Sequence, residues 1–233
     1  MVEKGFVPTR ETARAFLMAG EVLVDEVPVI KPGALVQDHA NISLKARRIY
    51  VSRGGLKLAG ALKRFHIEIG ELVALDVGAS TGGFTDCLVQ HGASRVYAVD
   101  VGYGQLDQRI RSHERVVVLE RTNARYPFDL PEHVDIITID VSFISLKKII
   151  PSVKEKLARS GVIVALVKPQ FEAERKDVGR KGVIRNPETH SRVLGDMVLW
   201  AIGNKLRVRG LIASPILGSK GNREFFLLLH PLE

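Results

Sequence analysis

The stretch VALDVGASTGGF, residues 73–84, decides the fold class. It passes from a short apolar run into a cluster of glycines, and residues 83–91 then predict a helix. Glycines at a strand-to-helix junction permit a tight turn and let a ligand approach the backbone closely. The stretch therefore indicates the first strand, loop and helix of an α/β domain, with a ligand site at the loop.

The spacing of these glycines distinguishes two kinds of ligand. The dinucleotide fingerprint has glycines at its first, third and sixth places, which here hold Gly78, Ser80 and Gly83. The middle glycine lets a pyrophosphate lie against the backbone, so its replacement by serine argues against a nicotinamide dinucleotide. S-adenosylmethionine carries no phosphate and tolerates the serine, and it is the expected cofactor. The alternative is a turn that only packs the helix on the sheet.

Outward from this loop, strands and helices alternate. Strands are predicted over 96–101, 116–119, 135–141 and 162–167, and helices over 105–112, 146–159 and 186–204. Two final strands, 207–213 and 224–230, are joined without a helix, so they should be antiparallel. The expected fold class is α/β, a Rossmann-like doubly wound sheet with a terminal antiparallel hairpin.

Residues 1–47 predict a separate, small α+β module. Thr9 can cap a helix that runs to about Met18, and Gly20 ends it. Short strands are expected over 21–30 and 41–44. The expected organisation is this module, a linker over 48–58 and a larger domain over 59–233.

Bulk composition bounds the protein class. The apolar runs 162–167 and 225–229 are far too short to span a bilayer, and no secretory signal is visible. A single cysteine, Cys87, cannot form an internal disulfide, so a cytoplasmic protein is expected. No metal site is expected.

Positive charge is unevenly distributed along the chain, whose net charge is +8. Seven basic residues and no acidic one lie between positions 45 and 64, which favours contact with nucleic acid. A second basic group, over 175–185, also has acidic residues within and beside it, and it is equally consistent with a solvated surface. Arg10 and Arg14 share a helix face that meets either RNA or solvent. The candidate RNA-binding residues are Arg10, Arg14, Lys45, Arg47, Arg48 and Arg53.

Three polar residues extend the expected cofactor site. Asp100 ends the second strand, where a carboxylate can accept hydrogen bonds from both ribose hydroxyls of the cofactor. Asp76 could meet the cofactor's ammonium group directly or through water. Asn123, a little beyond the third strand, could reach the adenine edge.

Four charged residues occupy positions that a sheet-edge site would bring together: Lys57, Asp140, Lys168 and Glu224. Ligands of open α/β sheets bind outside the carboxyl ends of the parallel strands, where Asp140 and Lys168 fall. A ribose hydroxyl is a poor nucleophile, and a lysine can take its proton or stabilise the oxyanion. Lys168 is the expected base, with Lys57 and Glu224 orienting the ribose and Asp140 positioning the lysine and the methyl group. The alternative is a set of solvated strand-end charges.

Six longer motifs carry a family resemblance: SRGGLKL (52–58), DVGASTGGFTDC (76–87), VDVGYGQL (99–106), DVSFIS (140–145), VKPQFE (167–172) and GNRE (221–224). The chain resembles the TlyA, or hemolysin A, family, whose catalytic half is similar to the FtsJ ribose methyltransferases. The resemblance implies methyl transfer from S-adenosylmethionine to a ribose 2′-hydroxyl of ribosomal RNA, free or in a ribosomal subunit. The four charged residues match the family's catalytic set. The motifs add Thr81, Gly82, Phe84, Val101, Gln105, Leu106 and Asp140 to the cofactor site.

The resemblance also implies that the first module is an RNA-binding domain like that of ribosomal protein S-four. Such a domain begins with a further helix, whereas this sequence starts inside or just after it. The family's linker has tryptophan between a variable residue and valine, and here the sequence is RIYV, residues 48–51. Tyr50 can still stack on a base or pack within the protein, so tyrosine in place of the family's tryptophan is expected to have a modest effect.

Three rival functions stand beside this one. The family name suggests a membrane-active haemolysin, although the apolar stripe of the helix over 188–204 is better explained as a core face. A non-catalytic RNA-binding or assembly protein would bind RNA without methyl transfer. A small-molecule methyltransferase is disfavoured by the basic N-terminal half.

Overall fold

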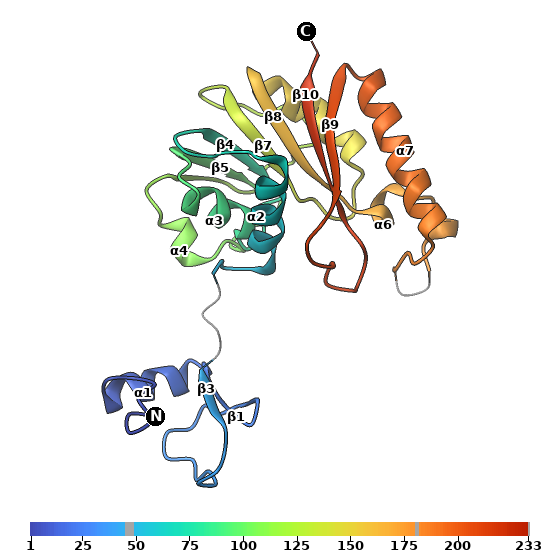
Figure 1. Ribbon diagram of the computed structural model, residues 1–233. Coiled ribbons are helices and arrows are strands. Elements are labelled where there is room, and N and C mark those ends of the chain that lie inside the picture. Colours follow the sequence, from blue (N-terminus) through green and yellow to red (C-terminus); the bar gives the residue numbers. More distant parts are fainter. Residues whose placement is uncertain (45–48, 180–181, 233) are drawn as a thin grey trace. The chain divides into compact units, whose positions relative to one another are not determined.

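The computed structural model describes residues 1–44, 49–179 and 182–232 (Figure 1). Lys45, Arg47 and Arg48, expected to bind RNA, lie outside the described residues. The chain divides into two compact units, Met1–Arg48 and Ile49–Glu233. Within the described ranges, no helix combines the length and the apolar character that crossing a membrane requires.

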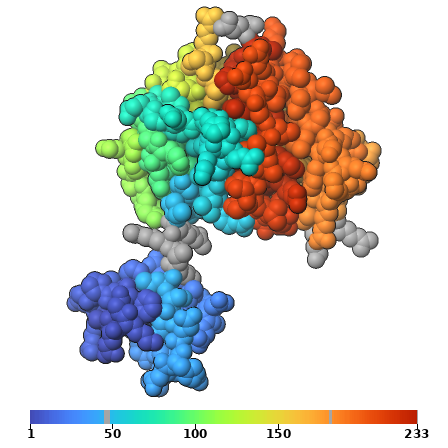
Figure 2. Space-filling view, viewed as in Figure 1, coloured from blue at the N-terminus to red at the C-terminus, as the bar shows by residue number. Residues whose placement is uncertain are grey.

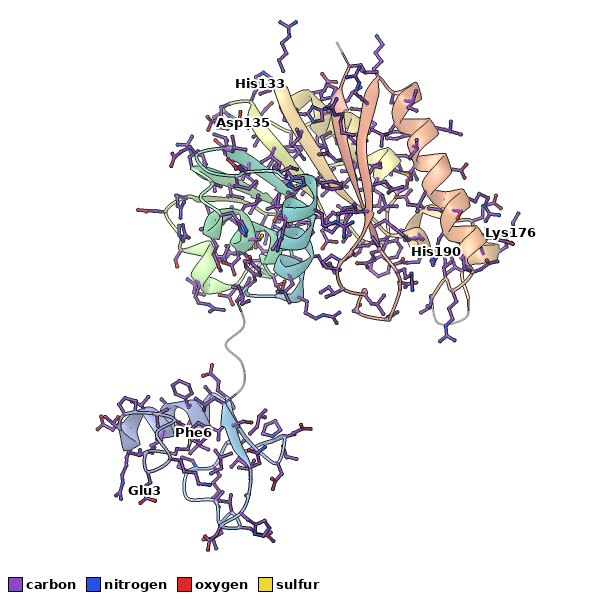
Figure 3. All side chains as sticks on the ribbon, viewed as in Figure 1. Glu3, Phe6, His133, Asp135, Lys176 and His190 are labelled. Atoms are coloured by element: carbon purple, nitrogen blue, oxygen red, sulfur yellow. The ribbon has the colours of Figure 1, made fainter. Side chains whose placement is uncertain are left out.

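The smaller unit is one helix and a three-stranded antiparallel sheet. Helix α1 (Arg10–Met18) begins at Thr9, whose side chain accepts a hydrogen bond from the Thr12 amide. Strands β1 (Val22–Val24), β2 (Val27–Pro28) and β3 (Ile42–Leu44) pair in the order β2-β1-β3. Residues 1–9, which carry Glu3 and Phe6 (Figure 3), form turns and bends.

The larger unit is built on a seven-stranded sheet, and this confirms the expected fold class. The strands are β4 (Val73–Val77), β5 (Arg95–Val99), β6 (Val116–Leu119), β7 (Val134–Ile139), β8 (Leu157–Val167), β9 (Leu206–Ala213) and β10 (Phe225–Pro231). Their order is β6-β5-β4-β7-β8-β10-β9. The first five are parallel, and β10 lies antiparallel between β8 and β9.

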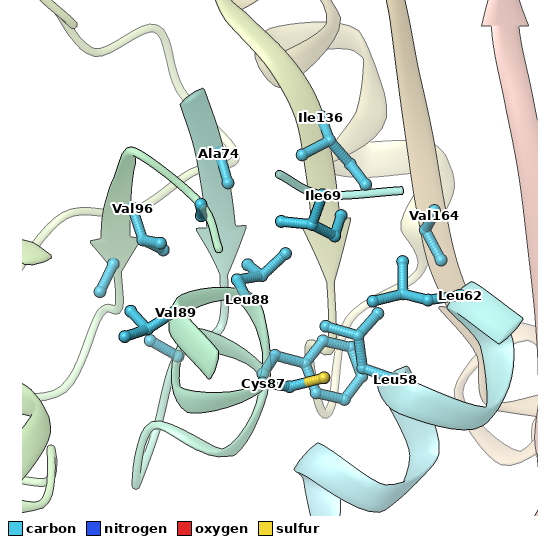
Figure 4. Close-up of a cluster of buried hydrophobic side chains, with 14 of the residues drawn as sticks. Leu58, Leu62, Ile69, Ala74, Cys87, Leu88, Val89, Val96, Ile136 and Val164 are labelled. Carbon is cyan, nitrogen blue, oxygen red and sulfur yellow. The ribbon is translucent and has the colours of Figure 1, made fainter. Parts of the chain in front are cut away.

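Helices cover both faces of this sheet. The first face carries α2 (Arg53–Phe65), α3 (Gly83–Gln90) and the short α4 (Gln108–Arg111), over a core in which Leu58, Leu62 and Leu88 are buried (Figure 4). The second face carries α5 (Ile150–Val153) and α7 (Pro187–Gly203) over an equally apolar core. The shorter pieces are η1 (Leu146–Lys148), η2 (Lys154–Lys156), α6 (Pro169–Glu172) and η3 (Arg175–Asp177).

Two predicted elements differ from the structure. The helix expected over 146–159 is broken into η1, α5 and η2, because Pro151 has no amide hydrogen to continue a hydrogen-bond ladder. The next strand then starts at Leu157, whose backbone pairs with Val134. The helix expected over 105–112 begins only after Asp107, which caps α4 by accepting a hydrogen bond from the Arg109 amide.

Helix α2 occupies the last part of the segment expected as a linker. Ser52 caps it, and its apolar positions 58, 61 and 62 face the core. Tyr50 is buried and packs against α2, where a Cβ on Gly55 would lie 2.3 Å from its Cγ. Of the two roles open to Tyr50, packing is the one observed. In Figure 2 the cyan surface of α2 adjoins the red surface of the β9–β10 segment.

The carboxyl ends of the parallel strands share one edge of the sheet, at the bottom of the larger unit in Figure 1. The β9–β10 loop, α4 and α6 lie along this edge. His133 and Asp135 mark the opposite edge (Figure 3), where the Asp135 carboxylate accepts a hydrogen bond from the Val73 amide at 2.9 Å. The edge with the loops is where residues 78–84, 140–145 and 168–172 meet.

Candidate active site

The glycine loop lies directly against the segment that carries Asp140. Gly78 has φ +86°, and a Cβ there would lie 2.6 Å from the Asp140 carbonyl oxygen. The amides of Gly78 and Ala79 both donate to the Val99 carbonyl, which ties the loop to β5. Gly78 is therefore required by the close approach of one backbone to another, and the approach of a ligand to this loop stays a prediction.

A pocket of about 520 Å³ opens beside this loop at the ends of β4, β5 and β7. Five of the predicted cofactor residues line it together with Gly78 and Ser80: Asp100, Val101, Gln105, Asn123 and Asp140. The carboxylate of Asp100 accepts hydrogen bonds from the amides of Ser80 and Gly102, at 2.8 and 2.7 Å. Each carboxylate oxygen can accept a further bond, so the group stays available to a ligand.

Asp76 does not line this pocket. It is fully buried under the loop, and its carboxylate accepts hydrogen bonds from the hydroxyls of Thr85 (2.6 Å) and Thr138 (3.0 Å). Burial raises the pKa of Asp76 to about 7, although these hydrogen bonds act in the opposite direction. The two threonines hold the carboxylate under the glycine loop, and the contact of Asp76 with the cofactor's ammonium group, directly or through water, stays a prediction.

The remaining predicted cofactor residues divide between two places. Thr81, Gly83 and Phe84 line the neighbouring pocket that holds the charged residues. Leu106 lines a small recess beside Asp100, and Gly82 packs on it, where a Cβ would lie 2.8 Å from Leu106 Cδ1.

The four charged residues form two ion pairs. Lys57 Nζ lies 2.6 Å from Glu224 Oε2, and Lys168 Nζ lies 2.6 Å from Asp140 Oδ1. Lys57, Lys168 and Glu224 are each at least nine-tenths buried. All four line one pocket of about 230 Å³, so they are not a scatter of solvated charges. Helix α2 delivers Lys57, and β10 delivers Glu224 from the opposite direction.

Ser142 is a further residue of this site, for which the sequence supplied no role. Its Oγ accepts a hydrogen bond from Lys168 Nζ at 2.9 Å. The glycine-loop pocket and the charged pocket meet at Gly78, Ser80, Asp140 and Ser142, so a ligand in the first can reach into the second. Among the described residues, no group of three or more His, Cys, Asp or Glu is placed to hold a metal ion.

A third pocket, of about 330 Å³, adjoins the other side of Lys168 and Glu224. Phe143 and Phe171 line it, with ring centroids 5.0 Å apart. Phe143 is 90% exposed and has φ +63°, in the left-handed region that bulky residues rarely adopt.

Glu172 holds the segment after β7 to the segment after β8. Its carboxylate accepts hydrogen bonds from Ser145 Oγ (2.5 Å) and from the Leu146 amide (2.8 Å). Burial is the largest influence on this group and raises its pKa. These bonds fix residues 140–146, which carry Asp140, against the short helix that follows Lys168.

The predicted RNA-binding residues are found in both units. Arg53 lines the charged pocket, and its guanidinium donates to the Leu217 carbonyl at 2.6 Å. Arg10 and Arg14 are exposed on α1. The larger unit therefore contributes one of the described candidates and the smaller unit two.

A Rossmann-like sheet with a glycine loop and charged pairs at its carboxyl edge defines the methyltransferase class. In fold alone, the larger unit is similar to an S-adenosylmethionine-dependent methyltransferase from Aquifex aeolicus, with a TM-score of 0.55 and 18% identity over 77% of this chain and 93% of that chain. The FtsJ-like methyltransferase family matches residues 50–230, and this chain belongs to that family.

Similar proteins extend the likeness to almost the whole chain. YqxC of Bacillus subtilis is 47% identical over 99% of this chain and 83% of its own. The 16S/23S rRNA (cytidine-2′-O)-methyltransferase TlyA of Mycobacterium tuberculosis is 42% identical over 98% of this chain and 87% of its own. A solved structure from Streptococcus thermophilus has a TM-score of 0.79 at 42% identity, over 99% of this chain and 86% of that one.

Proposed function

We propose that this protein transfers the methyl group of S-adenosylmethionine to a ribose 2′-hydroxyl of ribosomal RNA. The observation that carries the proposal is the pair of buried lysine–carboxylate contacts in a pocket that opens into the glycine-loop pocket. A relative of 42% identity is named for this reaction on cytidine. A binding protein without catalysis has no need of two buried charge pairs at the junction of two pockets.

The glycine-loop pocket suits S-adenosylmethionine on two grounds. It has the volume of an ordinary small-molecule site, and it exposes the Asp100 carboxylate for ribose hydroxyls. Asp100, Gln105 and Asn123 would hold the adenosyl part, and Asp140 would lie near the reacting end. The bound cofactor supplies an electrophilic methyl group.

The chain's own residues prepare the nucleophile. Lys168 would act as the base once its ammonium group has lost a proton: the neutral amine would take the proton of the ribose hydroxyl and so prepare that oxygen to attack the methyl group of the bound cofactor. Asp140 and Ser142 hold Lys168 Nζ in place, and Lys57 with Glu224 orients the ribose. The target base would enter the third pocket, where Phe143 offers an exposed ring for stacking.

The S-four-like RNA-binding role of residues 1–47, and the contacts of Arg10, Arg14 and Arg53 with RNA, belong to the same proposal. The exposure of Arg10 and Arg14 on one helix supports it.

Labelled S-adenosylmethionine tests the function directly. The protein is incubated with separate small and large ribosomal subunits and with their protein-free RNAs, and labelled riboses are mapped. Wild type should label a ribose, and Lys168→Ala should lose transfer while keeping cofactor affinity. RNA binding without label in any wild-type reaction would instead identify a non-catalytic binding protein.

A further inference from the structure

A second surface lies beyond the charged pocket, on the loops that follow β5 and β6. Tyr103 is 69% exposed there, and the guanidinium carbon of Arg121 lies 4.3 Å from the centre of its ring. This cation–π geometry leaves a planar guanidinium and an aromatic ring open to solvent together. Neither group lines the charged pocket or takes part in the contacts of Lys57 and Lys168.

The pair is held in place by backbone contacts between the two loops. The Arg121 amide donates to the Gly102 carbonyl at 3.1 Å, and the Thr122 amide donates to the Asp100 carbonyl at 3.0 Å. The Gly104 amide donates to the Glu120 carboxylate at 2.8 Å. Tyr103 and Arg121 are therefore presented by a rigid double loop.

Arg121 is also held in a conformation that arginine rarely adopts. Its φ is +55°, in the left-handed region, which side chains other than glycine enter at a cost. The neighbouring carboxylate of Glu120 pairs with Arg111. Within the described part of the chain, Arg121 forms no ion pair, so its charge is available to a partner.

A second tyrosine–arginine pair, Arg125 and Tyr126, follows Arg121 on the loop after β6. Tyr126 is 56% exposed, and the guanidinium carbon of Arg125 lies 5.6 Å from its ring centre. The Tyr126 amide donates to the Asn123 carbonyl, and Asn123 lines the glycine-loop pocket. Phe143 is exposed on another wall of that pocket. The tyrosine–arginine surface, meaning Tyr103, Arg121, Arg125 and Tyr126, thus lies on the two loops that also supply Val101, Thr122 and Asn123 to the lining of that pocket.

Exposed rings with unpaired guanidinium groups match one kind of partner. Unpaired bases stack on tyrosine rings and on guanidinium planes, and phosphates pair with arginine. We propose that the tyrosine–arginine surface binds the unpaired RNA strand next to the target nucleotide. The proposal rests on the proposed function, whose RNA substrate it extends. A base-paired helix would not expose the base faces that these side chains require.

Substitutions can separate stacking from charge. Tyr103→Ala should weaken binding of a fluorescein-labelled single-stranded RNA oligomer about tenfold, since stacking on an aromatic ring is worth roughly 1–3 kcal/mol per base. Arg121→Asn removes the guanidinium but tolerates the left-handed backbone, and should lower the slope of log affinity against log salt by about 1. Arg121→Lys keeps the positive charge, so the slope of log affinity against log salt should match wild type. Lysine has no planar group, so the part of the RNA affinity that comes from stacking on the guanidinium should be lost.

Two controls make the outcome decisive. Arg207→Asn changes an exposed arginine on β9, at the end of that strand far from Glu224, and should leave RNA affinity unchanged. Affinity for S-adenosylmethionine and the melting temperature should match wild type in every variant. Unchanged RNA affinity in Tyr103→Ala and Arg121→Asn would overturn the proposal, as would a loss confined to cofactor affinity. The RNA affinity is measured without methyl transfer. A wild-type protein that binds RNA but transfers no methyl group would therefore contradict the proposed function and not the proposed RNA-binding surface.

Discussion

Lys57 and Glu224 form an ion pair whose side chains are 11% and 4% exposed, so removing either one strands a buried charge. Glu224→Ala should therefore destabilise the protein by about 3 kcal/mol and abolish transfer. Replacing both residues by alanine should cost less than the sum of the single changes, because no charge is left unpaired. Denaturant unfolding of the two single variants and the double variant gives the coupling energy. Strict additivity would show that the two side chains do not interact in solution.

The buried carboxyl of Asp76 predicts an unusual pH dependence. Its pKa is raised from 3.8 to about 7, so between these values the folded protein binds a proton that the unfolded chain releases. This contribution to stability is complete below about pH 4 and is lost as pH rises through 7. The free energy of unfolding of wild type should therefore fall relative to Asp76→Asn over that range. A constant difference between the two proteins at pH 4, 6 and 8 would contradict it.

Among single residues, the sequence predicted those whose identity the backbone conformation requires. Gly78 lies at a strand-to-helix junction where no side chain fits, and the glycine pattern of the sequence predicted a tight turn there. The role of Asp76 stays a prediction, because an acidic residue in the sequence does not indicate whether its side chain faces a ligand or two buried threonines. Ser142 had no signal of its own, since only the fold brings it to Lys168, 26 residues away.

At the scale of elements, Glu172 joins the segments after β7 and β8. Glu172→Ala removes two hydrogen bonds to a carboxylate, each worth roughly 1.5–3 kcal/mol, and frees the segment that carries Asp140. We expect kcat to fall at least tenfold and affinity for S-adenosylmethionine to change little. Ser145→Ala, which removes one bond, should lie between this variant and wild type. Glu155→Ala, an exposed glutamate on η2, is the matched control and should behave as wild type.

Elements with a strong local pattern were predicted, and those set by tertiary packing were not. The start of α7 was clear from Asn186 and Pro187, and the structure has both in those roles. Helix α2 begins within the predicted linker, residues 48–58, and its cap Ser52 and apolar positions 58, 61 and 62 are the pattern of a capped amphipathic helix. The break at Pro151 was equally readable, since proline inside a helical pattern marks a boundary.

At the scale of the molecule, the chain divides into two compact units, and both large apolar clusters of the described residues lie within the second. A chain reduced to residues 49–233 should unfold cooperatively and bind S-adenosylmethionine as the full chain does, because every cofactor candidate lies within it. Its KM for ribosomal RNA should rise, since Arg10 and Arg14 are lost. Calorimetry, cofactor titration and the methyl-transfer assay check the three expectations. An unchanged KM would remove the RNA-binding role from the first unit.

The placement of β10 has a consequence for the order in which the charged pocket can form. This strand follows β9 in the sequence, yet it lies between β8 and β9, and Glu224, the residue preceding it, pairs with Lys57. Lys57, Asp140 and Lys168 all come earlier in the sequence. The charged pocket is therefore incomplete in any folding intermediate in which β10 has not yet paired with β8, and such an intermediate should transfer no methyl group.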